Sequence, residues 1–388
     1  MKRFLDNIST LNIGKHFMTN QSEFTLWAHS CAHIGTDKFY GRESLADAIR
    51  QSEGLRGPRF PYFPWDIAIN CGDYSGSQGL PKDQEGEELI QQFEVLKNHY
   101  REQIYDVCGN HDRSGKNEQR NGWWRKWVDP TGENTEFSRV DSSKRPFPIN
   151  GTWERYSFRV GNILFLMMSD VNDTSDIEGR DTLGGNPAGV VRSETFEWWK
   201  NQIEANPDCL VVSVHHYVLK DTTVASGEFE GMFRDCDGNL HSGYHGCKNH
   251  EADRGASYLY YLDDQPDAQA FERYLDNHPS ATDLWIAGHT HTHPEDRMGG
   301  KSHIETKWGV HFINCAALTQ HHGTQHNCPM SRVLTFTDGS DKVRVRCYLH
   351  SESDSSIFSH GGNQFQASPG WYPNAERLLQ LKRPFEKA

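Results

Sequence analysis

The stretch Ile104-Tyr105-Asp106-Val107-Cys108-Gly109-Asn110-His111-Asp112 places a glycine and three potential metal ligands directly after a short apolar run. The apolar part, Ile104–Cys108, has the length and composition of a buried β-strand. Gly109 permits a sharp backbone turn, which points the side chains that follow away from the strand. Since ligands bind at the carboxyl ends of the strands in α/β sheets, this stretch predicts a strand that delivers polar side chains to a site.

Four other apolar runs end in the same way. Phe24–Ala28 precedes His29-Ser30-Cys31-Ala32-His33-Ile34-Gly35, Trp65–Asn70 precedes Cys71-Gly72-Asp73, Leu210–Val214 precedes His215-His216, and Leu284–Ala287 precedes Gly288-His289-Thr290-His291-Thr292-His293. One histidine at a strand end is more often an ordinary polar residue than a ligand. Five such groups at five strand ends indicate a shared metal site. Imidazole and carboxylate ligands suit zinc, iron or manganese, and a bridging carboxylate can hold two cations.

The rest of the pattern predicts a layered α/β domain. Further strands are expected at Ile163–Met168, Val310–Asn314, Val333–Phe336 and Val343–Tyr348, and helices at Arg42–Glu53, Glu85–Tyr100, Ser193–Ala205 and Ala268–His278. Ser193 is the expected N-cap of its helix. Tyr156–Val160 and Ile163–Met168 form an expected hairpin about Gly161-Asn162.

Composition excludes several classes of protein. The chain has 388 residues and a formal charge of −13, which argues against a nucleic-acid binder that works by neutralising phosphates. No run of 18 apolar residues occurs, so no membrane span is expected. The first residues lack the apolar stretch of a secretory signal, and the nine scattered cysteines are typical of reduced thiols. We therefore expect a cytoplasmic enzyme.

The domain organisation follows from the two stretches that lack periodicity. Residues 113–155 and 217–265 are too long for plain connections and are expected to be insertions over one end of the sheet. We predict a single catalytic domain over residues 1–350 and a C-terminal tail over 351–388, which ends in a short basic, helix-like segment. A homo-oligomer is an open alternative.

The order of the strand-end motifs resembles that of the calcineurin-like metallophosphoesterases, a superfamily that includes purple acid phosphatases, phosphodiesterases and Mre11-type nucleases. The most specific pair is Gly109-Asn110-His111-Asp112 followed by Gly288-His289-Thr290-His291, and the motifs extend from residue 29 to 291. The resemblance implies a four-layer α/β/β/α sandwich with inserted capping loops. It also implies a binuclear centre of divalent or trivalent iron, zinc or manganese.

The resemblance further implies a role for each motif residue. The first metal takes the first-strand residue, His33, Asp73 and His291, and the second takes Asp73, Asn110, His215 and His289. His216 is the alternative to His215. His111 is the expected outer-sphere acid, and Asp112 is expected to orient it.

The first motif departs from the family, because Cys31 occupies the position of an aspartate. A thiolate remains a competent ligand, is softer than a carboxylate and favours iron or zinc. Three interpretations remain open: Cys31 binds metal, it lies beside a partly filled site, or it is a core residue and another side chain such as His29 binds instead. Cys71 and Cys108 are interpreted as small buried core thiols.

Such a centre predicts a phosphoester hydrolase, in which a metal-activated hydroxide attacks phosphorus and His111 protonates the leaving oxygen. A small or medium-sized, soluble, anionic substrate is expected. Arg113, His216, Tyr217, Arg254 and Tyr258 are the candidate substrate-binding residues, and Trp123 and Trp124 could also cap the site. His241, His245, Cys247 and His250 are a weaker candidate for a separate zinc site.

The alternative is a lyase that uses the same metals, retuned by Cys31, for elimination from a carboxylated or sugar substrate. A non-catalytic scaffold is disfavoured, because a scaffold has no need of the His111–Asp112 pair.

Overall fold

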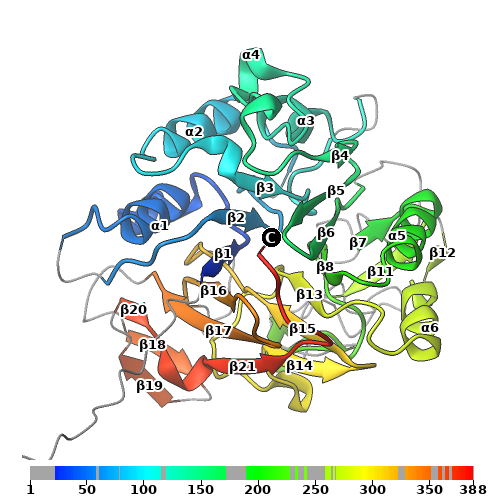
Figure 1. Cartoon of the computed structure of the whole chain (residues 1–388). Helices are drawn as coiled ribbons and strands as arrows, with labels where there is room; N and C mark the ends of the chain where they lie inside the picture. Colours follow the sequence, from blue (N-terminus) through cyan, green and yellow to red (C-terminus); the bar gives the residue numbers. More distant parts are fainter. Residues whose placement is uncertain are drawn as a thin grey trace, which may run out of the picture.

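Two seven-stranded mixed sheets form the centre of the structure, which is a computed structural model (Figure 1). It describes residues 22–57, 61–77, 79–114, 119–171, 189–227, 232–234, 240–242, 258–263, 265–266, 268–321, 328–350, 357–360, 363–366 and 369–387. Arg254 and the candidate zinc residues Cys247, His245 and His250 lie outside these ranges.

The first sheet has the order β20-β17-β16-β1-β2-β3, with β21 also paired to β17. Its strands are β1 (Glu23–His29), β2 (Ile67–Asn70), β3 (Ile104–Asp106), β16 (Met330–Thr337), β17 (Lys342–Leu349), β20 (Gly370–Trp371) and β21 (Arg377–Gln380). Strands β1, β2 and β3 are parallel, so their carboxyl ends meet at one edge of the sheet.

The second sheet has the order β14-β15-β13-β8-β6-β5-β4. Its strands are β4 (Asn150–Gly151), β5 (Arg155–Val160), β6 (Ile163–Met168), β8 (Leu210–Val214), β13 (Leu284–Ala287), β14 (Ile304–Lys307) and β15 (Val310–Asn314). Strands β6, β8, β13 and β15 are parallel to their neighbours in this group. Their carboxyl ends also share one edge.

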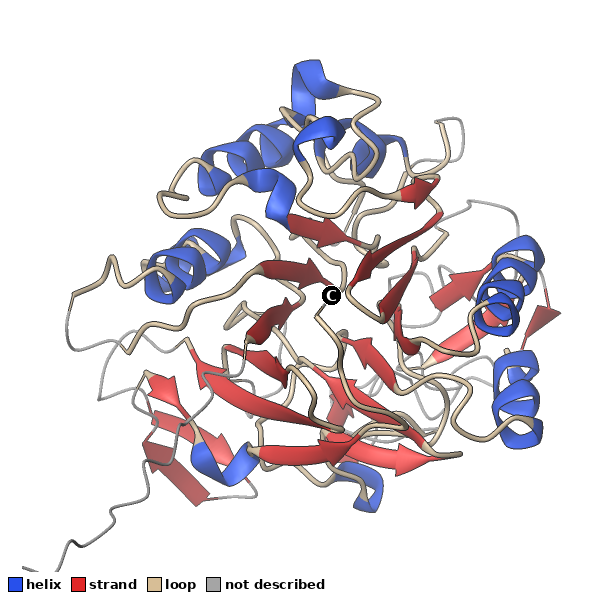
Figure 2. Ribbon diagram, in the orientation of Figure 1, coloured by secondary structure: helices blue, strands red, loops and turns tan. Residues whose placement is uncertain are grey.

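Helices cover the outer faces of both sheets, which gives four layers (Figures 1 and 2). Helices α1 (Ser44–Ser52), α2 (Asp83–Phe93) and α3 (Gly122–Trp127) pack on the first sheet, whereas α5 (Ser193–Ala205) and α6 (Gln269–Asn277) pack on the second. The alternation of side chains along each strand supplies the layers. Phe24, Leu26 and Ala28 of β1 enter the core between the sheets, and Trp27 enters the core beneath α1.

Smaller elements complete the described chain. They are α4 (Thr135–Ser138), β7 (Gly189–Val191), β9 (Met232–Arg234), β10 (Leu240–Ser242), β11 (Leu259–Leu262), β12 (Gln265–Pro266), β18 (Ile357–His360), β19 (Asn363–Gln366) and the 3-10 turns η1 (Thr36–Tyr40), η2 (Arg101–Gln103), η3 (Ser142–Lys144), η4 (Met298–Gly300) and η5 (Pro373–Ala375). No helix among the described residues is long and apolar enough to cross a membrane.

The expected strands and the sandwich architecture are confirmed, and three local predictions are wrong. The helix expected over Glu85–Tyr100 ends at Phe93. The N-cap of α5 is Arg192, and the hydroxyl of Ser193 bonds to Asp263 instead. The C-terminal segment expected to be helix-like contains the strand β21, which pairs with β17 because Leu379 completes the inter-sheet core.

The packing of α2 on α3 requires a glycine. A Cβ at Gly86 would lie 2.1 Å from the ring of Trp127. We expect Gly86→Ala to lower the free energy of unfolding by about 1–3 kcal/mol, because overpacking outweighs the better helix propensity of alanine. Urea denaturation measures this, with Gly122→Ala in α3 as the control, since its nearest contact is 3.4 Å away. An equally stable Gly86→Ala protein would contradict the prediction.

Candidate metal centre

The strand-end residues of both sheets converge on Asp73. Cys31 and His33 follow β1, Asp73 follows β2, and Asn110 follows β3, whereas His216 follows β8 and the pair His289 and His291 follows β13. All are buried. The backbones of Cys31, His33, Asp73 and His289 adopt φ values of 50°, 43°, 63° and 67°, in the left-handed region that non-glycine residues rarely occupy. Such strain concentrates at functional sites.

The first group of donors contains Cys31, His33 and His291, whose ligand atoms all lie within 4.8 Å of one another. Nε2 of His33 is 3.3 Å from Nε2 of His291 and 3.8 Å from Oδ2 of Asp73. The Cys31 sulfur is 3.9 Å from the same Asp73 oxygen. Cys31 is therefore one of the described residues whose ligand atoms could hold a metal ion.

The second group gathers around His216. Its Nε2 lies 3.1 Å from Oδ2 of Asp73, 3.0 Å from Oδ1 of Asn110 and 3.2 Å from Nδ1 of His289. His215, which the sequence analysis expected as this ligand, has other surroundings in the structure. Nδ1 of His215 accepts the backbone N–H of Tyr217, and its buried Nε2 has no partner among the described residues. The side chain of His216 was the sequence-based alternative, and it is the one that faces Asp73.

The hydrogen-bond pattern fits a cation in each group. Nδ1 of His33 donates to the Ser75 carbonyl, at 2.9 Å, and Nδ1 of His216 donates to the Cys71 carbonyl, at 2.6 Å. Each Nε2 atom thereby keeps a lone pair that can bind a cation, as in metal-ligating histidines. Two ligands of one tetrahedral ion at 2.0–2.1 Å lie about 3.3–3.4 Å apart, close to the His33–His291 separation.

The electrostatics of Asp73 depend on its neighbours. Although burial acts in the opposite direction, His216 and His111 hold the pKa of Asp73 well below its usual range. Burial and the charge of Asp73 raise the pKa of Asp112 to about 7. The two carboxyl groups therefore have separate roles, with Asp73 as the permanent anion of the centre.

His111 lies beside this centre, and the hydrogen bond described for its ring is to Ser77, whereas Asp112 was the residue expected to orient it. Nδ1 of His111 donates to the carbonyl of Ser77 at 2.9 Å, and its ring centroid lies 4.5 Å from that of His33. The carboxylate of Asp112 instead accepts the backbone N–H groups of Asp73, Ser75 and Gly109. Asp112 thus shapes the loop that presents Asp73. Burial lowers the pKa of His111, although Asp73 opposes this.

Three of the candidate substrate-binding residues are described besides His216. Arg113 is half-buried, its Nε donates to the Gly79 carbonyl, and its charge reaches His111. Tyr217 is buried with its ring 4.3 Å from that of His289. Tyr258 is also buried and pairs through its backbone with Val218. Of these three residues, Arg113 is the one that is not fully buried.

The insertion over residues 113–155 has a structural role in its described part. Trp123 and Trp124 are buried in the core beneath α2, which is a structural role. The hairpin β9–β10 carries His241, whose side chain lies outside the described atoms.

Asp170 is a residue that the sequence analysis missed. It follows β6 at the same edge as the candidate metal-binding residues and is fully buried. Although burial acts in the opposite direction, the charge of Asp73 raises the pKa of His216, and Asp170 adds to this effect. Its Oδ1 accepts the N–H of Val190. The signal was available, because Ser169-Asp170 directly follows an apolar strand as the other motifs do. Cys71 and Cys108 are buried core thiols, as expected.

His29 faces away from the centre, towards the core beneath α1. Its ring lies 4.6 Å from that of Trp27, and neither of its nitrogens has a partner among the described residues. Burial, with a smaller effect of Arg101, lowers the pKa of His29 to about 3. His29 is therefore not a substitute ligand for Cys31 in this structure.

This neutral histidine predicts a pH dependence of stability. Above pH 6.5 neither the folded nor the unfolded form is protonated at His29, whereas between 6.5 and about 3 only the unfolded chain binds the proton. Stability is therefore lost as the pH falls, by about 2 kcal/mol between pH 7 and 5. We expect His29→Asn to lose about that much less over this range in urea titrations of metal-free protein. Parallel curves for the two proteins would contradict this assignment.

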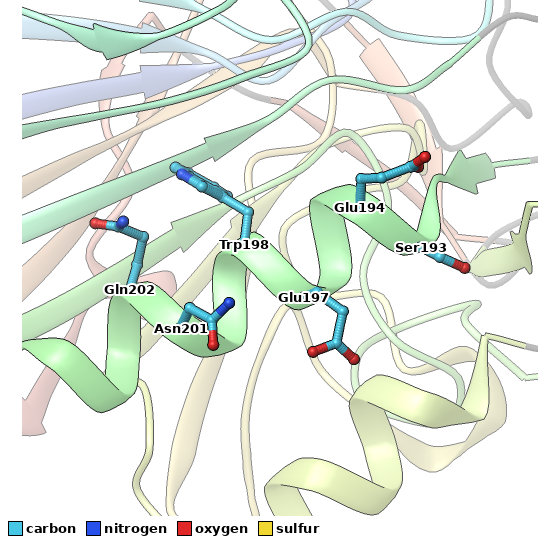
Figure 3. Close-up of a pocket in the computed structure, with 6 residues that line it drawn as sticks. All are labelled: Ser193, Glu194, Glu197, Trp198, Asn201 and Gln202. Atoms are coloured by element: carbon cyan, nitrogen blue, oxygen red, sulfur yellow. The ribbon is translucent and has the colours of Figure 1, made fainter.

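A pocket with a volume of ≈ 610 Å³ lies along α5 (Figure 3). Its lining residues are Ser193, Glu194, Glu197, Trp198, Asn201 and Gln202. None of them belongs to the candidate metal centre.

Comparisons with known proteins identify distant structural likenesses and no family. No family model matches the chain, and no curated protein is similar to it. A single mutant of Vps29 from Entamoeba histolytica aligns over 92% of this chain and 100% of its own, at 10% identity and a TM-score of 0.33. Vacuolar Protein Sorting 29 from Cryptosporidium parvum aligns over 92% of this chain and 98% of its own, at 10% identity and a TM-score of 0.31.

The sulfate thiohydrolase SoxB from Thermus thermophilus, in complex with glycerol, is a further likeness. It covers 84% of this chain and 56% of its own, at 11% identity and a TM-score of 0.38. The TM-scores and sequence identities of all three proteins are too low to assign an activity. A function for this chain therefore has to be argued from the geometry of its candidate metal centre.

Proposed function

We propose that this protein is a metal-dependent phosphoester hydrolase of the calcineurin-like metallophosphoesterase type, with two cations at the centre around Asp73. The observation that carries the proposal is the convergence of potential metal ligands on the carboxylate of Asp73. These nitrogen, oxygen and sulfur atoms come from the ends of four other strands in two sheets. Donors of these types suit zinc, iron and manganese.

The proposed ligands divide into two groups that share Asp73. Cys31, His33 and His291 would hold one cation with Asp73, and Asn110, His216 and His289 would hold the other. Such a pair lowers the pKa of a bound water and neutralises charge on a phosphoryl group. The protein supplies the geometry: the Ser75 and Cys71 carbonyls fix the rings of His33 and His216.

His111 is the proposed general acid. Since its Nδ1 donates to the Ser77 carbonyl, Nε2 carries the transferable proton of the protonated ring. A positioned histidine of this kind contributes roughly 10²–10⁴-fold to turnover. Arg113, two residues further on, would hold an anionic group of a small or medium-sized soluble substrate, and its charge effect on His111 supports this role.

The test combines metal analysis with activity on aryl phosphate monoesters and diesters. We expect two metals per chain and turnover of at least one substrate. Two bound metals with no turnover of any aryl phosphate would refute hydrolysis and favour the elimination chemistry that a retuned centre could perform. No bound metal would refute the centre itself.

Cys31 sets the character of the proposed centre, which makes its replacement informative. A thiolate donates more charge than a carboxylate and weakens the cation as a Lewis acid. We expect Cys31→Asp to raise aryl phosphate turnover by roughly tenfold, or about 1.4 kcal/mol. Metal preference should move from iron or zinc towards manganese or magnesium. Unchanged turnover and preference, measured at full metal loading, would show that Cys31 does not bind metal.

A further inference from the structure

Ser30 lies between β1 and Cys31 and is fully buried. Its Oγ is 3.2 Å from the Cys31 sulfur and 3.2 Å from the carbonyl oxygen of Gly72. A hydroxyl has one proton to donate, so Ser30 can satisfy either the carbonyl or the sulfur at any moment. The carbonyl of Gly72 already accepts the N–H of Cys31, at 2.9 Å. A deprotonated Cys31 sulfur has no proton to give to Ser30, so in a metal-bound Cys31 it is the sulfur that would need the Ser30 hydroxyl as a donor.

The position of Ser30 is fixed by close packing from the second sheet. A Cβ at Gly288 would lie 2.0 Å from its Oγ and 2.2 Å from its Cβ, so the loop that carries His289 and His291 presses directly on Ser30. The Ser30 carbonyl accepts the N–H of Leu318 at 3.0 Å. Ser30 cannot swing away from Cys31 without moving these segments.

The Cys31 sulfur would be a charged acceptor when it binds a cation, because a coordinating thiol is deprotonated outright. Hydrogen bonds to a metal-bound sulfur withdraw electron density from it and tune the metal.

We propose that Ser30 is a positioning residue whose hydroxyl donates to the Cys31 thiolate and limits the charge that this thiolate passes to its cation. The inference rests on the proposed function, in which Cys31 is a ligand. Ser30 would then restore part of the Lewis acidity that a thiolate in place of a carboxylate removes. No covalent bond is broken in this role. The only change is whether the hydroxyl proton of Ser30 faces the Cys31 sulfur or the Gly72 carbonyl oxygen.

Cobalt substitution tests the proposal without relying on activity. The full chain is loaded with Co²⁺, and the near-ultraviolet sulfur-to-cobalt charge-transfer band is recorded. We expect the band in the wild type and in Ser30→Ala, with equal cobalt content but a shift to lower energy in the variant, because the sulfur lone pairs rise when the hydrogen bond is lost. Ser30→Thr, which keeps the hydroxyl, should hold the wild-type band position.

The controls separate this inference from the proposed function. Cys31→Ser should abolish the band, and Ser331→Ala should leave it unchanged, since Ser331 is a buried serine on β16 that bonds to His350. If Ser30→Ala does not fold, Ser30→Gly serves in its place. An unshifted band at full loading overturns the role of Ser30 and leaves the function standing. Absence of the band in the wild type overturns the role of Ser30 as well, while metal content and phosphatase assays still decide the function.

Discussion

Replacement of His216 by alanine is expected to remove one of two bound metals and to lower turnover of an aryl phosphate by about 10³-fold. Nε2 of His216 lies within 3.2 Å of donor atoms of Asp73, Asn110 and His289, so no other described side chain takes its place at the centre of that group. A cation supplies several kcal/mol of transition-state stabilisation, and about 4 kcal/mol corresponds to this factor.

The adjacent residue provides a matched control. His215 is as fully buried as His216, but its Nδ1 faces the backbone of Tyr217. We expect His215→Ala to keep both metals and most of the activity, with a loss confined to stability. Metal content by mass spectrometry and turnover at saturating metal decide the question. The assignment fails if His215→Ala loses the metal and His216→Ala keeps it.

The second large effect is expected for His111→Ala. This protein should retain both metals, because His111 is not among the proposed ligands. It should lose roughly 10²–10⁴-fold in turnover of a phosphate ester with a poor leaving group, since the proposed donor to the departing oxygen is then missing. An ester with an activated leaving group, such as p-nitrophenyl phosphate, should be affected far less.

The comparison of the two substrates identifies the acid role, because a general loss of folding or metal would lower both rates together. His311→Ala is the control, since this half-buried histidine lies on β15 and bonds to the carbonyl of Gln380. Equal losses on both esters would mean that His111 acts in binding rather than in proton transfer.

The fold was largely predictable because its strands are short apolar runs with clear ends. The motif positions followed from one rule, that parallel strands deliver the residues after them to a common edge. The same rule, applied to β6, would also have identified Asp170. It could not choose between His215 and His216, because residues beyond the strand no longer alternate regularly between the two faces.

Other errors arose where distant backbone decides the outcome. The sequence gives no indication that the Ser77 carbonyl, rather than Asp112, holds His111, since that contact depends on the loop after Asp73. The end of α2 at Phe93 and the strand β21 depend on packing partners far along the chain. For Trp123 and Trp124 the sequence could not separate a core role from a capping role, because burial beneath α2 leaves no periodic signal in a short helix.

The distribution of the proposed ligands between the two sheets has a thermodynamic consequence. Cys31, His33, Asp73 and Asn110 follow strands of one sheet and His216, His289 and His291 follow strands of the other, so a cation bound between them would oppose any separation of the sandwich. Ligand binding to the folded state alone adds about 2.7 kcal/mol of stability at a free concentration 100 times the dissociation constant. On the proposed function, the supply of metal in the surroundings would therefore govern how long the folded protein survives as well as how fast it works.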